Sequence, residues 1–227
     1  SDVCSSDLQH HRPRVYGHVK GTRVAKNIIQ ECSRLGVKYL TLYAFSTENW
    51  MRPQAEVTFL MKILRRYLKK ETQNLIKENI RFTVIGEIDR LPADVASSVI
   101  SAMAATEKCN GLNLVFAISY GSKQEITNTV KHLAEKIAAG EMTADQIDEA
   151  TIQSHLSTAG TPDPDLILRT SGEQRLSNFL LWQAAYSEFY FTNQLWPDFT
   201  VADLKTAFED YGNRQRRFGK VAQKNEI

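Results

Sequence analysis

One stretch of sequence decides the fold of this chain: YLTLYAFSTENWMRP, residues 39–53. Its first part, residues 39–45, is rich in aromatic and apolar residues and predicts a buried strand. Polar residues follow directly, and Pro53 is suited to the first turn of a helix. In an open α/β sheet such polar residues lie at the carboxyl edge of the strands, where these sheets bind ligands. Taken alone, the stretch is also consistent with an ordinary loop between a strand and a helix.

Strands and helices alternate along the rest of the chain. The sequence predicts strands over residues 38–45, 80–85, 112–118, 166–169 and 188–192, and helices over residues 20–35, 54–79, 92–108, 122–139 and 201–211. Thr143 and Gln146 add a capping box for one more helix. This alternation predicts an α/β fold with a mostly parallel sheet and helices on both faces. Because no repeat, linker or low-complexity tract interrupts it, we interpret residues 9–227 as a single domain.

The composition of the 227 residues is that of a soluble globular protein, with 42% hydrophobic and 24% charged residues. A net charge of +2 gives no argument for nucleic acid as a partner. Cys4, Cys32 and Cys109 have neither metal-ligand spacing nor a pairing pattern, which suits a reducing cytosol. The most apolar long stretch, residues 179–196, is interrupted by polar residues and is not a membrane span. We therefore expect a cytoplasmic protein without a signal peptide.

A second segment, Arg169-Thr170-Ser171-Gly172-Glu173-Gln174-Arg175-Leu176-Ser177-Asn178, carries the clearest chemical signal. A short apolar run leads into Arg169 as a strand would. The arginine guanidinium is a rigid fork of donors that binds phosphate oxygens bidentately, and a glycine lets the backbone approach a ligand closely. Two arginines and a serine around a Gly/Ser turn therefore predict a site for a diphosphate. A surface loop with solvated arginines remains the alternative for this segment in isolation.

Together, these segments resemble the motifs of the cis-prenyltransferase family. Blocks along the chain match that family's motifs in order, namely residues 14–18, 43–53, 165–177, 187–192 with 195–199, and 213–219. The resemblance covers about residues 12–219 of the chain. It implies the α/β fold with a mostly parallel sheet that the alternation of elements also predicts.

The resemblance implies an enzyme that elongates a prenyl diphosphate. An allylic prenyl diphosphate would lose its diphosphate, isopentenyl diphosphate would attack the resulting carbon, and loss of a proton would leave a new cis double bond. The implied product is a long cis-polyprenyl diphosphate, a precursor of a cell-wall lipid carrier that is delivered to the membrane. The implied enzyme is a magnesium-dependent homodimer without a transmembrane segment, cytoplasmic or peripheral at the inner membrane.

Matching positions carry the roles that the resemblance implies. Arg169, Arg175, Leu176 and Ser177 match the residues that bind isopentenyl diphosphate, and Glu188 matches a carboxylate that positions Mg²⁺. The other substrate-binding positions are Arg14, His18, Ser46, Thr47, Glu48, Trp50 and Arg52. Asn49 matches the residue assigned to proton removal. Because a neutral amide is a poor base, we expect Asn49 to orient the substrate or to relay the proton through diphosphate or water.

Ordinary structural roles remain open for several of these residues. Glu188 is alternatively a solvated carboxylate at the end of a strand, and Trp50 a core side chain. The apolar stripe of the helix predicted over residues 54–79 fits a channel for a prenyl tail or a face packed on the core, and its periodicity does not separate the two. A non-catalytic partner subunit that binds diphosphate is the alternative to an enzyme, although such subunits do not generally keep the Ser-x-Glu-Asn-Trp block.

The chain departs from the family pattern at three places. Upstream of Arg14 the family has Asp-Gly-Asn-Gly-Arg-Trp-Ala, which holds the allylic diphosphate and magnesium, whereas residues 1–8 read SDVCSSDL. We interpret residues 1–8 as a non-matching segment on a truncated enzyme, assign no role to its aspartates, and expect impaired catalysis. Residues 119–123 read Ser-Tyr-Gly-Ser-Lys where Asn-Tyr-Gly-Gly-Arg is usual, and Ser171 replaces a glycine of the arginine motif.

Overall fold

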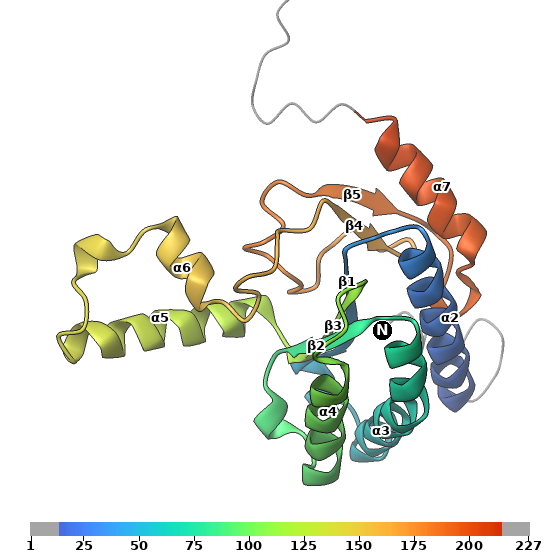
Figure 1. The fold of residues 1–227 in the computed structure, drawn as a ribbon, viewed down its shortest axis with the longest axis horizontal. Coiled ribbons are helices and arrows are strands. Elements are labelled where there is room, and N and C mark those ends of the chain that lie inside the picture. Colours follow the sequence, from blue (N-terminus) through green and yellow to red (C-terminus); the bar gives the residue numbers. More distant parts are fainter. Residues whose placement is uncertain (1–13, 215–227) are drawn as a thin grey trace, which may run out of the picture.

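The structure, a computed structural model, describes residues 14–214, with side chains from residue 17 onward. In this part of the chain the helices are α2 (Arg14–Arg34), α3 (Gln54–Lys77), α4 (Ala93–Thr106), α5 (Ser122–Ala138), α6 (Glu149–His155) and α7 (Val201–Gly212). The strands are β1 (Tyr39–Ser46), β2 (Arg81–Ile85), β3 (Asn113–Tyr120), β4 (Leu166–Arg169) and β5 (Glu188–Phe191). Figure 1 shows how these elements are arranged in space.

Every described pair of strands is parallel, which confirms the predicted α/β fold. β3 lies between β1 and β2 in a three-stranded sheet, and β4 pairs with β5 in a second sheet. The sequence predicted one sheet, but the described strands form two because none of them hydrogen-bonds to both β1 and β4. β1 and β4 are therefore both edge strands within the described residues.

The main hydrophobic core lies on one face of the three-stranded sheet. Successive residues of a strand point to opposite faces, and Leu114, Phe116 and Ile118 of β3 share the face that meets helices α2, α3 and α4. Buried helix residues that complete this cluster include Val24, Ile28, Ile29, Val57, Met61, Leu68, Leu75, Val95 and Val99. The apolar side chains on one face of each of these helices are thus the ones that pack against β3.

The opposite face of the sheet meets a loop segment. Val115 and Ala117 of β3 form a second buried cluster with Leu180, which follows the arginine motif. Next to it, the ring of Phe179 stacks on that of Tyr43 from β1, with 4.6 Å between the ring centroids. This face of the sheet therefore positions the segment that follows the predicted diphosphate loop.

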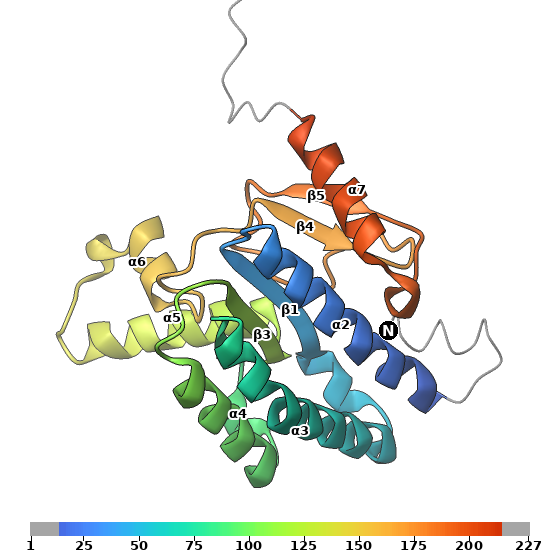
Figure 2. The same cartoon turned by 45° about the vertical axis from the view of Figure 1, so that its right-hand side comes forward.

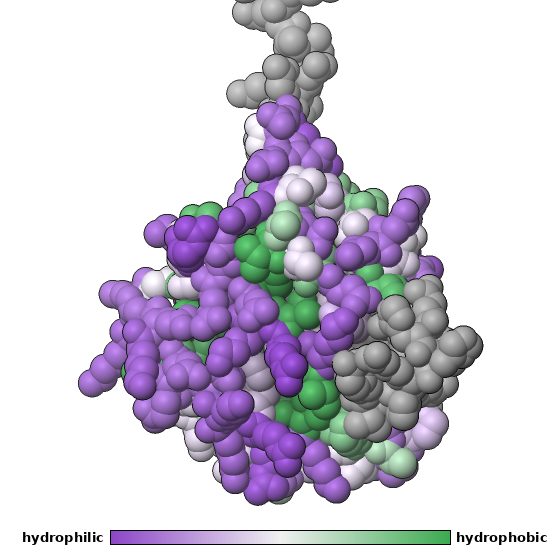
Figure 3. Space-filling model, turned by 90° about the vertical axis from the view of Figure 1, so that its right-hand side faces the viewer, coloured by the Kyte–Doolittle hydropathy of each residue, from purple (hydrophilic) through white to green (hydrophobic). Residues whose placement is uncertain are grey.

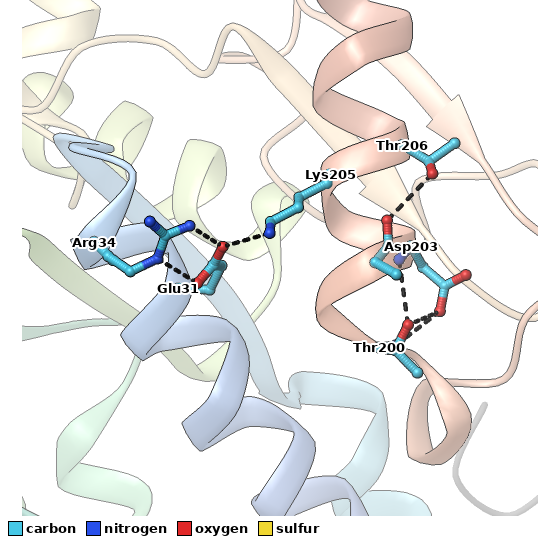
Figure 4. Close-up of polar contacts among 7 residues, drawn as sticks. Glu31, Arg34, Thr200, Asp203, Lys205 and Thr206 are labelled. Carbon is cyan, nitrogen blue, oxygen red and sulfur yellow. Dashed lines mark hydrogen bonds and ion pairs between the residues drawn. The ribbon is translucent and has the colours of Figure 1, made fainter.

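Helix α2 connects the two sheets. It contacts both α7 and the turn Trp196–Asp198, and Figure 2 shows α2 passing beside β1 with α7 next to it. Glu31 of α2 accepts a hydrogen bond from Arg34 Nε (2.8 Å) and lies 3.4 Å from Lys205 Nζ of α7 (Figure 4). Trp196 Nε1 also donates to the Gly21 carbonyl at 3.2 Å.

Helix α5 projects away from the sheets and carries α6 alongside it (Figure 1). The predicted capping box of Thr143 and Gln146 is present, with Thr143 N–H donating to Gln146 Oε1 at 2.7 Å. It closes only a single 3₁₀ turn, Ala144–Gln146, so the prediction that it begins the next helix was wrong. α6 begins instead after Asp148, whose carboxylate accepts the Thr151 N–H at 2.7 Å.

Candidate functional site

A cavity of about 800 Å³ lies between the two sheets. Residues 41–46 of β1, residues 167–169 of β4 and the following Thr170 line it, together with side chains of α2 and α3. Because both edge strands border this cavity, the residues at their carboxyl ends reach the same space. This is the edge of the sheet at which the sequence predicted ligand binding.

The carboxyl end of β1 continues into a 3₁₀ turn, Thr47–Met51, that begins with a capping box. Ser46 N–H donates to Asn49 Oδ1 at 3.0 Å, and this bond fixes the orientation of the Asn49 amide. Ser46, Glu48 and Asn49 all line the cavity. Burial alone would raise the pKa of Glu48, but hydrogen bonds from Asn178 and from its own turn hold that pKa below its ordinary value. A charged carboxylate therefore stands at the cavity wall.

The arginine loop closes the other side of the cavity. Arg169 is the last residue of β4 and is half-buried, whereas Arg175 is exposed and forms an ion pair with Glu173. Both arginines line the cavity with Leu176 and Ser177. The structure thus brings together all four residues that the resemblance assigns to isopentenyl diphosphate.

Backbone hydrogen bonds hold this loop to the segment after β5. Ser171 N–H donates to the Gln194 carbonyl and Gly172 N–H to the Thr192 carbonyl, each at 2.8 Å. Ser171 and Gly172 both adopt left-handed backbone, with φ of 72° and 68°. The loop between the arginines is therefore anchored at its tip as well as at its start in β4.

An arginine and a histidine converge on one carboxylate at the α2–α3 side. Arg52 Nη1 lies 2.8 Å from Glu56 Oε1, and His18 Nε2 lies 3.7 Å from the same oxygen, an ion pair when the imidazole is protonated. His18 and Arg52 line the cavity. The structure thus gathers these two predicted substrate-binding residues, which lie far apart in the sequence, at one wall.

An apolar part of the cavity is lined by one face of α3. Its residues there are Leu60, Met61, Ile63, Leu64 and Tyr67, and Phe116 of β3 adds to them. The Tyr67 and Phe116 rings stack with centroids 5.9 Å apart, and burial raises the pKa of the Tyr67 hydroxyl. α3 therefore both lines the cavity and packs on the core, since Val57, Leu68 and Leu75 of the same helix are core residues.

Several predicted residues do not line the cavity. Trp50 donates from Nε1 to Ser119 Oγ at 2.9 Å and packs edge-on against Phe45, with centroids 4.9 Å apart. Thr47 packs against Gly121, where a Cβ would lie 2.5 Å from Thr47 Oγ1. The placement of Trp50 fits the core-packing alternative. The Arg14 side chain lies outside the described side chains.

Glu188, at the start of β5, also lies outside the cavity lining. Arg214 Nη1 donates to Glu188 Oε2 at 2.9 Å and to the Phe189 carbonyl at 2.9 Å. Within residues 14–214 no group of three or more His, Cys, Asp or Glu side chains could hold a metal ion. A single carboxylate is compatible with Mg²⁺, which usually keeps several waters and is bound through one or two carboxylates together with substrate phosphates.

Sequence reasoning missed part of the cavity wall. Gly21, Thr22 and Ala25 line it with His18, and their spacing of three, four and seven residues from His18 places them on one face of α2. Asn178, next to Ser177, lines it as well. The helical spacing from His18 was a usable signal for the first group, but no local pattern marked Asn178.

The fold and the cavity define a class of protein: an α/β protein whose cavity is lined by Arg169, Arg175 and Ser177 of one loop and by apolar side chains of α3. A family model described as "Putative undecaprenyl diphosphate synthase" matches residues 7–219 of the chain. The chain belongs to this family, which confirms the resemblance to cis-prenyltransferases.

Individual relatives agree with this assignment. The chain is 49% identical over 209 residues to an isoprenyl transferase of Geobacter sulfurreducens, which covers 92% of this chain and 85% of that protein. It is 47% identical over 211 residues to the ditrans,polycis-undecaprenyl-diphosphate synthase ((2E,6E)-farnesyl-diphosphate specific) of Micrococcus luteus, covering 93% and 85%. The crystal structure of lavandulyl diphosphate synthase from Lavandula x intermedia in complex with dimethylallyl diphosphate matches with a TM-score of 0.92 and 38% identity, covering 95% and 93%.

Among the helices of residues 14–214, none combines the length and the hydropathy that a membrane span requires. On the molecular face seen in Figure 3, hydrophobic residues form a band between hydrophilic flanks rather than a continuous apolar surface.

Proposed function

We propose that this protein condenses isopentenyl diphosphate with an allylic prenyl diphosphate to make a long cis-polyprenyl diphosphate. The observation that carries the proposal is a single cavity with arginines and a serine at its mouth and an apolar wall along α3. A substrate with a diphosphate head and an isoprenoid tail matches this arrangement, because its head would meet the arginines and the serine and its tail would meet the apolar wall. The name of the Micrococcus luteus relative supports an allylic substrate of the farnesyl diphosphate type and an undecaprenyl product.

The two diphosphates are assigned to the two cationic walls. Arg169, Arg175 and Ser177 bind isopentenyl diphosphate, because guanidinium groups and a hydroxyl donate to phosphate oxygens from one loop. His18 and Arg52 bind the allylic diphosphate at the opposite wall, where Glu56 holds the Arg52 guanidinium in place. The apolar residues of α3 then take the growing tail.

The reaction breaks the bond between the allylic carbon and its diphosphate oxygen, and the electron pair leaves with the diphosphate. The double bond of isopentenyl diphosphate supplies the electrons of the new carbon–carbon bond, and loss of a proton from the adjacent carbon forms the cis double bond. Asn49 positions the isopentenyl group for this proton loss, since its amide is fixed by Ser46 N–H. The proton acceptor is a diphosphate oxygen or water, because an amide is not basic enough.

Glu188 is the residue we assign to magnesium. One carboxylate suits an ion that takes its other ligands from phosphate oxygens and water. Bound magnesium would supply neutralisation of the charge on the leaving diphosphate. Arg214 holds the Glu188 carboxylate at the start of β5 and keeps it oriented.

Residues 1–8 lead us to propose that catalysis by the chain as written is impaired. They lack the Asp-Gly-Asn-Gly-Arg-Trp-Ala motif of the family. Loss of one preorganised electrostatic contact typically lowers the rate by about 10²–10³-fold. Binding of isopentenyl diphosphate should persist, because Arg169, Arg175 and Ser177 are present.

The test compares this chain with a version in which residues 1–8 are replaced by a strand and the aspartate motif. Calorimetry with isopentenyl diphosphate should give binding for both proteins. Turnover of radiolabelled isopentenyl diphosphate with farnesyl diphosphate should be at least about a hundredfold faster for the restored version. Absence of binding in both proteins would overturn the proposed function. Equal turnover would overturn only the proposed impairment.

We also propose a cytoplasmic homodimer that passes its product to the membrane. Cys32 and Cys109 are buried free thiols, as expected in a reducing compartment. Sedimentation velocity on the purified chain tests the dimer, and a monomer at micromolar concentration would contradict it.

A further inference from the structure

The turn over residues 177–180, which follows Arg175, has an unusual backbone. Ser177, Asn178 and Leu180 have positive φ angles of 50°, 64° and 47°. Residues other than glycine rarely adopt this left-handed conformation, and asparagine tolerates it better than most. Such conformations persist only where surrounding contacts hold them, and they are frequent at ligand sites. Neighbouring residues must therefore hold this turn in its conformation.

Asn178 holds the turn to two other elements at once. Its Nδ2 donates to Glu48 Oε1 at 2.9 Å, beyond the end of β1. Its Oδ1 accepts the Lys123 N–H and its carbonyl accepts the Ser122 N–H, each at 2.8 Å, at the start of α5. One residue thus links the arginine loop, the Asn49-bearing turn and the start of α5.

The space around Asn178 is closed on the side of Gly121. A Cβ at Gly121 would lie 2.7 Å from Asn178 Nδ2 and 2.5 Å from Thr47 Oγ1. Behind the turn, Leu181 N–H donates at 3.0 Å to the hydroxyl of Ser122, a residue with 0% exposure. The Asn178 amide therefore has a fixed position between rigid neighbours and little freedom to seek other partners.

We propose that Asn178 is a positioning residue for the isopentenyl diphosphate site. Its side chain sets the distance between the Arg175–Ser177 wall and the Glu48–Asn49 wall, because it is bonded to Glu48 and is adjacent to Ser177 in the chain. This inference rests on the proposed function of the same cavity. The Arg175–Ser177 wall and the Glu48–Asn49 wall then act on one substrate only while the Asn178–Glu48 bond holds them together.

The test uses four proteins: the unchanged chain, Asn178→Asp, Glu48→Gln, and the double variant E48Q/N178D. Asn178→Asp keeps an acceptor for the Lys123 N–H and tolerance of positive φ, but it places a carboxylate against Glu48. In the double variant the new side-chain amide at position 48 can donate to the new carboxylate at position 178. The hydrogen bond is therefore restored with its donor and acceptor exchanged. Asn128→Asp, the same chemical change at an exposed position on α5, is the control. Binding of isopentenyl diphosphate and of inorganic diphosphate is measured by calorimetry, and melting temperature is measured in parallel.

We expect Asn178→Asp to bind isopentenyl diphosphate at least about tenfold more weakly than the unchanged chain, as for a lost charge-assisted hydrogen bond. The double variant should bind within about threefold of Glu48→Gln, because the bond is restored. Asn128→Asp should bind normally. If Asn178→Asp does not fold, Asn178→Gly removes the same side-chain bonds without adding charge or forbidding positive φ, and it should show the same loss of affinity.

Two results would overturn the inference while leaving the proposed function intact. One is binding by folded Asn178→Asp or Asn178→Gly that equals that of the unchanged chain, which would make Asn178 a support of the fold alone. The other is a double variant no better than Asn178→Asp. Failure of the unchanged chain to bind either diphosphate would instead overturn the proposed function, and this inference with it.

Discussion

Arg169 and Arg175 reach the same cavity under different restraints. Arg169 is half-buried at the end of β4, whereas the Arg175 side chain is 62% exposed and pairs with Glu173 of its own loop. Exposed ion pairs contribute little to stability, so a diphosphate can take the place of Glu173 as the partner of Arg175 at small cost. Removal of Arg175 should therefore report on ligand binding rather than on folding.

Arg175→Ala should weaken isopentenyl diphosphate binding by about ten- to a hundredfold, because a charge-assisted hydrogen bond contributes about 1.5–3 kcal/mol. Its melting temperature should stay close to that of the unchanged chain. Arg66→Ala, an exposed arginine on α3 that does not line the cavity, is the matched control for calorimetry. Unchanged affinity in Arg175→Ala would remove Arg175 from the proposed site.

At this scale the sequence predicted that Arg169, Arg175 and Ser177 lie at one site, and all three line the same cavity. Their binding of a diphosphate stays a prediction. Trp50 was harder to place, since an indole side chain can line a substrate site or pack in the core equally well. The orientation of the Trp50 ring also depends on its hydrogen bond to Ser119, which is distant in the sequence. Asn178 was missed because its partners come from other elements.

At the scale of elements, an ion pair with a buried carboxylate joins α2 to α3. Glu71 of α3 is 6% exposed, and its carboxylate lies 2.8 Å from Lys26 Nζ of α2. Burial alone would raise the pKa of Glu71, but hydrogen bonds from Lys26 and Asn74 hold that pKa below its ordinary value of 4.5. A carboxyl with a lowered pKa contributes stability that is present above its unfolded-state pKa and lost as the pH falls through its folded-state pKa.

Glu71→Gln should therefore cost about 1.5–3 kcal/mol of unfolding free energy at neutral pH, the range for a lost bond to a charged group. The difference from the unchanged chain should shrink as the pH falls below 4.5, where the unfolded-state carboxyl is protonated. Urea denaturation between neutral pH and acid measures both effects. A difference that stays constant with pH would show that the charge of Glu71 plays no part.

The strands and helices themselves were largely predictable from the sequence. β4 has the predicted bounds, Leu166–Arg169, and α3 begins at Gln54 as Pro53 indicated. The capping box at Thr143 was real but closed a 3₁₀ turn, and α6 begins after a second cap, Asp148, five residues later. Local signals identify where a turn can begin, whereas the length of the helix depends on what its face can be packed against.

At the scale of the whole molecule, the sequence predicted the α/β class but not the cavity. The alternation of strands and helices requires a parallel arrangement, and the described strands have it. The division into two sheets depends on which edges pair, and side-chain patterns along single strands do not carry that information. The homodimer stays a prediction for the same reason, since no partner surface is marked in the sequence.

The division into two sheets has a consequence for how the molecule opens. Among the strands of residues 14–214, no backbone hydrogen bond of the ladders joins β4–β5 to β1–β3–β2, so there the smaller sheet depends on side-chain packing and on the contacts of α2. Native-state hydrogen exchange should therefore reveal a sub-global opening in which the β4 and β5 amides exchange at lower free energy than those of β3. Isopentenyl diphosphate bound to Arg169 should slow the exchange of β4 and leave β3 unchanged. Equal protection of all five strands without ligand would instead mean that the two sheets unfold as one cooperative unit.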